Sequence, residues 1–359
     1  MPTLIGIILH APQGKTLLAV TWVGYNNQRL NGGLIIESNN AGCCQERKKM
    51  RKVVVTGGAG FIGSHLAEEL VGQGYYVIIL DDLSTGKLEN IAELLRKDNV
   101  EFIQGDITDL PLLQKLFHGI KYVFHQAALA RVPRSIADPV ASNETNIKGT
   151  LNVLMAAKEN RVRKVIYASS SSIYGDAPTL PLREDMLPNP LSPYALTKLA
   201  GEYYCIIFRQ IYGLSTACLR YFNVYGSRQD PHSQYATVIP AFIARISHNL
   251  PPVIFGDGEQ SRDFTFIQDV VRANILVAEN DAEGVYNIGS GKNITINQLA
   301  EIILKLMQKD LKPVHQKSRP GDPKHALADI SKANSFGYEP KWSLESGLSK
   351  TIEDFEQGG

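Results

Sequence analysis

A tyrosine and a lysine four residues apart, Tyr194 and Lys198, are the pair in this sequence best suited to chemistry. They follow Ser192 and Pro193, which are typical of the cap and first turn of a helix, so both side chains should lie on one helix face. A neighbouring ammonium favours a phenolate, and we therefore expect Lys198 to lower the pKa of Tyr194 towards neutrality. Tyr194 could then be a general base that removes a hydroxyl proton while hydride leaves the same carbon.

A run of four serines, residues 169–172, precedes this helix and follows the apolar stretch 164–168. Ser170 is placed to hydrogen-bond the reacting hydroxyl and so to orient it. A tyrosine and a lysine at this spacing are also common on ordinary helix surfaces. The catalytic interpretation therefore depends on a hydride acceptor and on the elements that would hold it.

The stretch 51–82 is suited to binding such an acceptor. Val53, Val54 and Val55 are typical of a buried strand in a parallel sheet, and a glycine turn and a helical apolar pattern follow them. In such a unit the glycines allow a tight turn, close approach of a pyrophosphate and close helix packing, and the helix N-terminus faces the phosphates. The predicted dinucleotide contacts in this turn are Gly57, Gly60, Phe61, Ile62 and Gly63.

A second apolar stretch, 76–80, ends in Asp81, whose carboxylate is placed to accept hydrogen bonds from an adenosine ribose. A 2′-phosphate would be repelled by this carboxylate, so the sequence favours NAD over NADP. The two following turns add predicted contacts with the adenosine: Asp82, Ser84, Gly86, Asp106 and Ile107.

Small residues follow the apolar stretch 121–125, where a cofactor could pass close to the backbone. Gln126, Ala127 and Ala128 are the predicted contacts there. Asn146, in the helical pattern 139–160, could either contact the cofactor or satisfy hydrogen bonds within the core.

Strands and helices alternate from residue 51 onward, which predicts an α/β fold with a doubly wound parallel (Rossmann) sheet and a smaller C-terminal substrate-binding lobe. We expect residues 50–225 to form the dinucleotide-binding domain. Residues 226–359 should be mainly the lobe, with some segments returning to the first domain. The expected strands of the sheet are 53–55, 76–80, 99–104, 121–125, 164–168 and 216–221. The segments assigned to the lobe are 252–255, 264–266, 284–288 and 319–329.

Residues 1–49 do not fit this alternation and show no binding pattern, although 16–23 could be a strand. They lack the charged start and cleavage site of a secretory signal. Met50 stands directly before the first strand of the sheet, and we expect it to be the true initiator.

Composition limits the classes of partner. The 37 Lys and Arg residues balance 36 Asp and Glu, which argues against a nucleic-acid partner, and no apolar run approaches the ~20 residues of a membrane span. The four cysteines show no metal-ligand spacing, so we predict no metal site. Cys205 and Cys218 are expected to be core thiols, which favours a reducing cytoplasm.

Taken together, these motifs resemble the extended short-chain dehydrogenase/reductase family of NAD-dependent epimerases and dehydratases. The resemblance covers Met50 to the C-terminus and includes Ser192-Pro-Tyr-Ala-Leu-Thr-Lys198 and Arg220-Tyr-Phe-Asn-Val-Tyr-Gly226. Within the family, His125-Gln-Ala-Ala-Leu is similar to the UDP-N-acetylglucosamine 4-epimerase branch of the UDP-hexose 4-epimerases. The resemblance implies tightly held NAD, a homodimer, and the catalytic set Ser170, Tyr194 and Lys198.

The resemblance also implies a reaction and a set of contacts. Tyr194 would take the proton of the sugar 4-hydroxyl while hydride passes to NAD, and the 4-keto sugar would turn over and accept hydride on its other face. Further cofactor contacts would be Ser169 and Tyr221, besides Tyr194 and Lys198. The substrate contacts would be Arg131, Ser170, Ser171, Tyr194, Asn223, Val238, Arg262, Arg319, Asp322 and Ala326. The forked donors of Arg262 and Arg319 suit a diphosphate, and Asp322 could accept from a ribose hydroxyl.

Two positions distinguish among related activities. Family members that dehydrate or decarboxylate their sugar usually carry an acid in the serine run, whereas this chain has Ser172, which favours epimerisation. A bulky residue at the position of Ala326 would exclude an N-acetyl group, so we expect N-acetylated hexoses to be accepted, together with UDP-glucose and UDP-galactose. Arg131 faces the presumed sugar and keeps a UDP-hexuronate substrate open, and a 4,6-dehydratase is a weaker alternative. A non-catalytic NAD-binding protein is a further one, although all three catalytic residues are present.

Overall fold

The computed structural model describes residues 3–10, 16–23, 50–230, 237–318 and 324–357. The chain forms two compact units, Met1–Met50 and Arg51–Gly359. In the first unit, β1 (Thr3–His10) pairs antiparallel with β2 (Thr16–Val23), so the expected strand at 16–23 is present. The second unit contains all of the predicted site residues.

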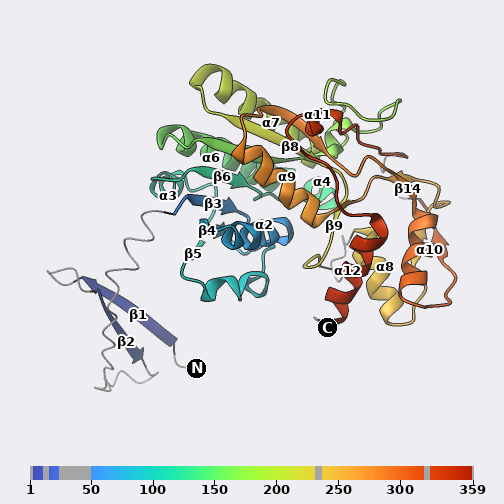
Figure 1. Ribbon diagram of the computed structural model, residues 1–359, viewed down its shortest axis with the longest axis horizontal. Coiled ribbons are helices and arrows are strands. Elements are labelled where there is room, and N and C mark those ends of the chain that lie inside the picture. The colour runs from blue at the N-terminus through green and yellow to red at the C-terminus, as the bar shows by residue number, and fades with distance from the viewer. Residues whose placement is uncertain (1–2, 11–15, 24–49, 231–236, 319–323, 358–359) are drawn as a thin grey trace. The chain divides into compact units, whose positions relative to one another are not determined.

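A seven-stranded parallel sheet forms the centre of the second unit (Figure 1). The spatial order is β13-β8-β7-β6-β3-β4-β5, so the direction of winding reverses between β3 and β6. The predicted doubly wound α/β fold is therefore confirmed. The strands are β3 (Lys52–Thr56), β4 (Tyr76–Asp81), β5 (Val100–Gln104), β6 (Tyr122–His125), β7 (Lys164–Ser170), β8 (Thr216–Tyr221) and β13 (Gly284–Ile288).

Helices cover both faces of this sheet, and β3 shows why. Val53 and Val55 pack into the cluster that contains α2 and α9, whereas Val54 packs into the opposite cluster with α3, α6 and α7. All three valines are fully buried, as expected of a strand with a helix layer on each side. The helices are α2 (Phe61–Gly72), α3 (Leu110–Leu116), α6 (Gly149–Glu159), α7 (Pro193–Tyr212) and α9 (Ile267–Glu279).

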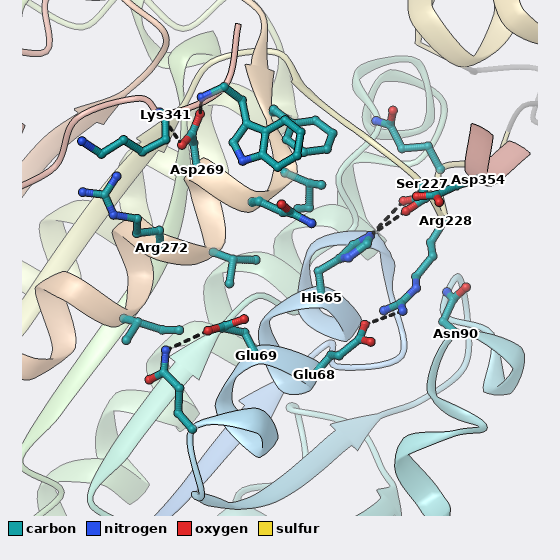
Figure 2. A pocket seen from close by; sticks show the side chains of 18 of the residues that line it. His65, Glu68, Glu69, Asn90, Ser227, Arg228, Asp269, Arg272, Lys341 and Asp354 are labelled. Atoms are coloured by element: carbon teal, nitrogen blue, oxygen red, sulfur yellow. Dashed lines mark hydrogen bonds and ion pairs between the residues drawn. The ribbon is translucent and has the colours of Figure 1, made fainter. Parts of the chain in front are cut away.

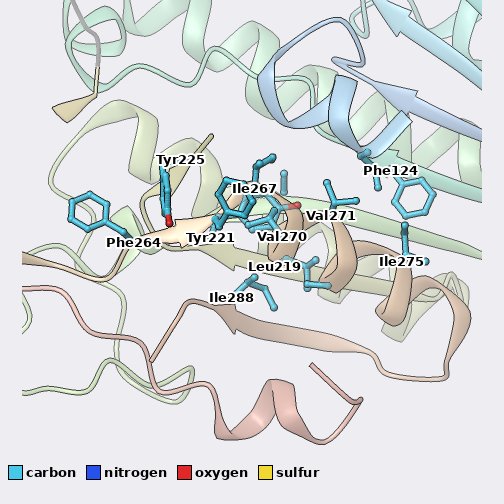
Figure 3. Packing of buried hydrophobic residues seen from close by; sticks show 14 of the residues in the cluster. Phe124, Leu219, Tyr221, Tyr225, Phe264, Ile267, Val270, Val271, Ile275 and Ile288 are labelled. Carbon is cyan, nitrogen blue, oxygen red and sulfur yellow. The ribbon is translucent and has the colours of Figure 1, made fainter. Parts of the chain in front are cut away.

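The cluster around α9 joins the C-terminal part of the chain to the sheet (Figure 3). Val270, Val271 and Ile275 of α9 are buried in the same cluster as Leu219 of β8 and Phe124 of β6. Burying one such side chain contributes about 1.5–3 kcal/mol, so this helix adds substantially to the stability of the sheet.

The helical stretch predicted at 139–160 is continuous but contains a π-helical turn at Glu144–Lys148, between α5 (Pro139–Asn143) and α6. Asn146 lies in this turn. A π turn accommodates one extra residue within a helix, and such turns are frequent at functional sites.

The expectation that 284–288 belongs to the smaller lobe is wrong, because β13 pairs in parallel with β8 over its whole length. The division of the chain at residue 225 remains a prediction. Outside the central sheet, the described residues of the second unit form three short strand pairs: β9 with β12, β10 with β15, and β11 with β14. Their bounds are β9 (Val224–Tyr225), β10 (Val253–Phe255), β11 (Ser261–Arg262), β12 (Thr265–Phe266), β14 (Ile294–Thr295) and β15 (Val314–Gln316).

Further helices complete the second unit: α4 (Val132–Ala137), α8 (Val238–Ser247), α10 (Ile296–Leu306), α11 (Ser331–Asn334) and α12 (Leu344–Gln357), with 3-10 turns at Leu88–Ile91, Leu94–Arg96 and Ser171–Tyr174. Within the described ranges, no helix combines the length and the apolar character needed to cross a membrane.

Candidate active site

The glycine turn after β3 brings three backbone segments into contact. Gly57 has φ +67°, and a Cβ there would lie 2.7 Å from the backbone N and Cα of Ala127, in the loop after β6. A Cβ at Gly63 would lie 2.1 Å from the carbonyl oxygen of Gly57. Only glycines allow strand, helix and neighbouring loop to meet at this point, where the order of strands reverses and such sheets bind their ligands.

Gly60 caps α2, so the positive end of this helix, with Phe61 and Ile62 in its first turn, lies beside the crevice between β3 and β6. This arrangement fits a dinucleotide pyrophosphate, because the positive end of a helix and its free N–H groups favour negatively charged phosphates.

Asp81 proves to hold the turn together. Its carboxylate is 6% exposed and accepts hydrogen bonds from the backbone N–H of Ala59 (2.9 Å) and of Leu83 (2.8 Å). Burial raises the pKa of Asp81, and these amides partly offset the effect. A Cβ on Gly86 would lie 2.7 Å from this carboxylate, so Gly86 lets the following turn fold over Asp81. The ribose contact predicted for Asp81 stays a prediction.

The other predicted adenosine contacts lie in local turns. Asp82 accepts hydrogen bonds from the backbone N–H and the hydroxyl of Ser84, at 2.9 and 2.7 Å. Asp106 accepts from the N–H of Thr108 at 2.7 Å, and Ile107 is buried. The two turns follow β4 and β5 on the same edge of the sheet as the glycine turn.

Gln126 and Tyr221 meet in a network that the sequence did not reveal. The Tyr221 hydroxyl lies 3.2 Å from Gln126 Oε1, and Asn274 of α9 binds both, through Tyr221 Oη (2.8 Å) and Gln126 Nε2 (3.1 Å). Asn274 is fully buried. The signal in the sequence that could have identified it is an amide side chain among the apolar residues of α9, since a buried amide needs hydrogen-bond partners.

Asn146 is 1% exposed, and its amide binds protein groups. Its Oδ1 accepts from the N–H of Leu129 (2.8 Å), and its Nδ2 donates to the Leu129 carbonyl (3.2 Å) and to the Thr197 hydroxyl (3.0 Å). Of the two roles left open for Asn146, these bonds favour the satisfaction of core hydrogen bonds.

The three predicted catalytic residues come together. Ser170 ends β7, while Tyr194 and Lys198 lie in the first turns of α7, which Ser192 caps as expected. The hydroxyl of Ser170 lies near enough to Tyr194 to lower the pKa of its phenol through a side-chain interaction. Lys198 Nζ donates to the Ala168 carbonyl at 2.7 Å and lies 5.9 Å from the centre of the Tyr194 ring.

The expectation that Lys198 lowers the pKa of Tyr194 is wrong for the protein alone. Burial raises the pKa of Tyr194, and the interaction with Ser170 offsets only part of that rise. Burial also lowers the pKa of Lys198 to about 7, so its ammonium is only partly charged at neutral pH. Lys198 therefore needs help from another positive charge to make Tyr194 a base.

NAD fits this need. Bound NAD would supply the hydride acceptor and, on its oxidised nicotinamide ring, a positive charge. The chain itself places Tyr194 to take a proton, Ser170 to orient the hydroxyl and Lys198 to share the charge.

The serine run is held by an internal network. The N–H and Oγ of Ser172 lie 3.2 and 2.9 Å from Ser170 Oγ. Ser169 Oγ donates to Glu202 at 2.6 Å, and Glu202 forms a two-point ion pair with Arg220, at 2.9 and 2.7 Å. The side chain of Ser169 is thus turned into the protein interior, and the cofactor contact predicted for this residue stays a prediction.

The Glu202–Arg220 pair was missed from the sequence. Glu202 is 2% and Arg220 4% exposed, and Arg220 stacks on Tyr174 with its guanidinium carbon 4.7 Å from the ring centre. A glutamate and an arginine inside otherwise apolar elements give the only local signal, since charges are almost never buried unless paired.

The predicted substrate residues occupy several elements. Asn223, at φ +27°, donates to the Asp263 carbonyl (2.9 Å), and Arg262 donates to the Ser261 carbonyl (2.9 Å). Arg131 caps α4 and Val238 begins α8. Ala326 is buried beside Tyr174, Leu182 and Phe222, and Ser171 begins the 3-10 turn that ends at Tyr174. Arg319 and Asp322 lie outside the described residues.

A cavity of about 1320 Å³ lies along α2, α9 and α12 (Figure 2). His65 of α2 contacts the Ser227 carbonyl at 3.1 Å, and Glu68 pairs with Arg228. Among the described residues that line it, none belongs to the catalytic set, so the cavity is separate from the chemistry. No cluster of metal-ligating side chains occurs in the part of the chain that the structure describes.

Residues 53–289 match the NAD dependent epimerase/dehydratase family. The chain belongs to this family. The predicted family and the predicted cofactor, NAD, are thereby confirmed, and the match includes the glycine turn, the serine run and the Tyr194–Lys198 pair.

The chain matches individual relatives over nearly the whole length of each relative. The chain is 37% identical over 308 residues to a UDP-glucose 4-epimerase of Mycolicibacterium smegmatis, which covers 85% of this chain and 98% of the relative. A solved UDP-N-acetylglucosamine 4-epimerase of Methanobrevibacter ruminantium, in complex with UDP-N-acetylmuramic acid, is 44% identical with a TM-score of 0.83 and covers 86% and 99%. A UDP-glucuronic acid 4-epimerase of Bacillus cereus, solved with UDP-glucuronic acid and NAD, is 36% identical with a TM-score of 0.80 and covers 86% and 100%.

Gly63→Ala should release NAD and destabilise the protein by about 1–3 kcal/mol, because its Cβ would collide with backbone that cannot move aside. The measurements are the NAD content of the purified protein and its free energy of unfolding. Gly72→Ala, in the same helix with no atom within 4 Å of the new Cβ, is the control and should match or exceed wild-type stability. Normal NAD content in Gly63→Ala would contradict this view of the turn.

Proposed function

We propose that the protein catalyses the NAD-dependent 4-epimerisation of a UDP-hexose. The observation that carries the proposal is the meeting of Ser170, Tyr194 and Lys198 at the carboxyl end of β7, in a serine run that carries no acid. The relatives described above are UDP-sugar 4-epimerases, which supports this reaction over dehydration and over a non-catalytic role.

The same residues would serve both halves of the reaction. Tyr194 removes the 4-hydroxyl proton, Ser170 holds the oxygen, and Lys198 stabilises the phenolate. After the 4-keto sugar turns over, C4 would accept hydride on its other face while Tyr194 returns the proton to the same oxygen, which leaves C4 inverted. No second substrate is required, because NAD is regenerated in each cycle.

We propose UDP-N-acetylglucosamine and UDP-N-acetylgalactosamine as substrates, together with UDP-glucose and UDP-galactose. Support comes from Ala326, which belongs to the same buried cluster as Tyr174, the last residue of the 3-10 turn after Ser170. A small side chain there leaves volume for an acetamide. The relative solved with UDP-N-acetylmuramic acid is named as an epimerase of an N-acetylated sugar, UDP-N-acetylglucosamine.

A UDP-hexuronate is the second candidate, and Arg131 is the observation that favours it. Arg131 lies at the N-terminus of α4, in the loop that follows β6 and the cofactor crevice. A guanidinium there could bind a C6 carboxylate with two donors. The relative from Bacillus cereus that was solved with UDP-glucuronic acid supports keeping this candidate.

The deciding experiment uses the purified protein without added cofactor. It is incubated separately with UDP-N-acetylglucosamine, UDP-glucose and UDP-glucuronate, and the products are resolved by proton NMR. We expect inversion at C4 of the first two sugars, and a loss of at least about 100-fold in rate for Tyr194→Phe, which cannot accept the proton. Inversion of glucuronate alone would favour the hexuronate, and loss of the C6 hydroxyl would indicate dehydration. Bound NAD without turnover would favour a non-catalytic protein.

Ala326→Tyr should abolish turnover of the N-acetylated sugar while UDP-glucose turnover is largely retained, because the ring would occupy the acetamide volume. The ratio of kcat/KM for the two substrates is the measurement. Ala326→Ser, which adds a single oxygen, is the control. An equal loss on both substrates would show that Ala326 does not contact the acetamide.

We also propose a homodimer, as expected from the resemblance, and a cytoplasmic location. The apolar face of α6 is buried in the core, so it is not available for an interface between subunits. α7 instead exposes a stripe at helical spacing, with Leu196 54%, Tyr203 53% and Ile207 42% exposed. α4 and α5 pack beside α7 and expose Ile136 and Val140, which widens the patch.

Ile207→Glu should shift the protein to a monomer, because two copies of the charge would be buried at a two-fold interface. Light scattering coupled to size exclusion measures the mass. Leu187→Glu is the control, since Leu187 is 91% exposed and lies outside the stripe. A wild-type monomer would exclude the proposal, as would a dimer unaffected by Ile207→Glu.

A further inference from the structure

His125 is a buried titratable group that the proposed chemistry does not use. It ends β6, is 1% exposed, and lies between two threonines. Its Nδ1 is 2.8 Å from Thr56 Oγ1, at the end of β3, and its Nε2 is 2.9 Å from Thr150 Oγ1, in α6. Both ring nitrogens therefore take part in hydrogen bonds.

The direction at Nε2 follows from Thr150. Its Oγ1 lies 2.6 Å from the carbonyl oxygen of Asn146, and a carbonyl can only accept. The single hydroxyl proton of Thr150 is thus donated to Asn146. The remaining role of the hydroxyl towards His125 is to accept, so the ring carries its proton on Nε2.

The direction at Nδ1 follows from the neutrality of the ring. Burial, together with the nearby charge of Lys198, lowers the pKa of His125 to about 3. Nδ1 is then a bare acceptor and receives the hydroxyl proton of Thr56. The oxygen of Thr56 in turn accepts from the N–H of Ala127 at 3.3 Å. With the ring neutral and its proton on Nε2, each bond in this series has a defined direction.

Both ends of the series lie at the candidate site. Ala127 is the residue whose backbone a side chain on Gly57 would strike. At the other end, Asn146 Nδ2 donates to Thr197 Oγ1, and Thr197 donates to the carbonyl oxygen of Tyr194 at 2.8 Å. The hydrogen bonds therefore run from the loop beside the glycine turn, through β3, β6 and the π-helical turn, to the first turn of α7.

We propose that His125, as the neutral tautomer with its proton on Nε2, is a positioning residue that fixes the NAD crevice relative to the helix carrying Tyr194. The proposal rests on the proposed function only in naming Tyr194 as the base. The π-helical turn has a part in it, because this turn contains Asn146, whose carbonyl accepts from Thr150 and whose amide reaches Thr197.

Protonation of His125 would break the series. A proton on Nδ1 would be donated to Thr56 Oγ1, which already accepts from the N–H of Ala127, so the hydroxyl proton of Thr56 would lose its acceptor. The groups that face the ring are Lys198 of α7, Tyr167 of β7 with ring centres 5.6 Å apart, and the hydroxyls of Thr56 and Thr150. Because the folded pKa is lowered, the contribution of His125 to stability is present above pH 6.5 and is lost as the pH falls towards 3.

The first test is NMR of the protein labelled with 15N-histidine, with the signal of His125 identified by its absence in His125→Asn. The expected result at pH 7 is a proton on Nε2, a bare Nδ1, and no titration between pH 8 and pH 5. A proton on Nδ1, or titration near pH 6.5, would overturn the proposal. This test requires no sugar, so its outcome is independent of the proposed function.

The second test removes one link with little change in volume. Thr150→Val leaves Nε2–H without an acceptor. We expect both the amount of NAD that stays bound and kcat to fall roughly 10-fold, with KM changed much less. Thr150→Ser, which keeps the hydroxyl, should restore both. Equal NAD retention and kcat in Thr150→Val and wild type would show that the series is not coupled to the site. Release of NAD by Thr150→Val in a protein that turns over no sugar would retain the positioning role and reject the proposed function.

Discussion

The meeting of three backbones at Gly57, Gly63 and Ala127 is the constraint on which the rest of the site depends. The strand β3, the helix α2 and the loop after β6 approach to distances at which no side chain fits. This close approach places the helix N-terminus beside the crevice where the strand order reverses. Asp81 then fixes the turn from one side through backbone amides, and the hydroxyl of Thr56 fixes the neighbouring loop from the other.

Burial sets the electrostatics of the catalytic set. Because its pKa is raised, Tyr194 stays protonated at neutral pH. Lys198, with a pKa of about 7, is only partly charged and alone stabilises the Tyr194 phenolate weakly. The same burial makes both residues sensitive to any further positive charge brought close to them, since screening by water is weak there. The strength of the base is thus tied to the state of the cofactor, as suits a site that must remove a proton only when hydride can also leave.

The sequence predicted the parts of the fold that have local patterns. Six strands of the sheet, the cap at Ser192 and the glycine turn each have a signal within a few residues. β13 was wrongly assigned to the lobe, because the pattern of a short strand does not show which sheet it joins. Its place is determined by pairing with β8, which is far away in the chain. The π-helical turn was not foreseen, since a shift of one residue in backbone hydrogen bonding leaves no mark on the apolar spacing.

The candidate site shows the same division. Ser170, Tyr194 and Lys198 could be named from spacing, and the structure brings them together. Their pKa values could not be predicted, because these depend on burial by residues from other elements. Asn274, Glu202 and Arg220 were missed because a polar residue in an apolar element shows that a partner exists but not which one.

The position of β13 also has a consequence for how the chain is made. β8 is an interior strand of the finished sheet, held between β7 and β13. A ribosome delivers β7 and β8 well before it delivers residues 284–288, so the nascent sheet ends in an open edge at β8 during that interval. An open edge can pair with other chains, and the intervening lobe must fold without blocking it. The time that passes before β13 is synthesised therefore determines how long the nascent chain exposes an edge strand that can aggregate.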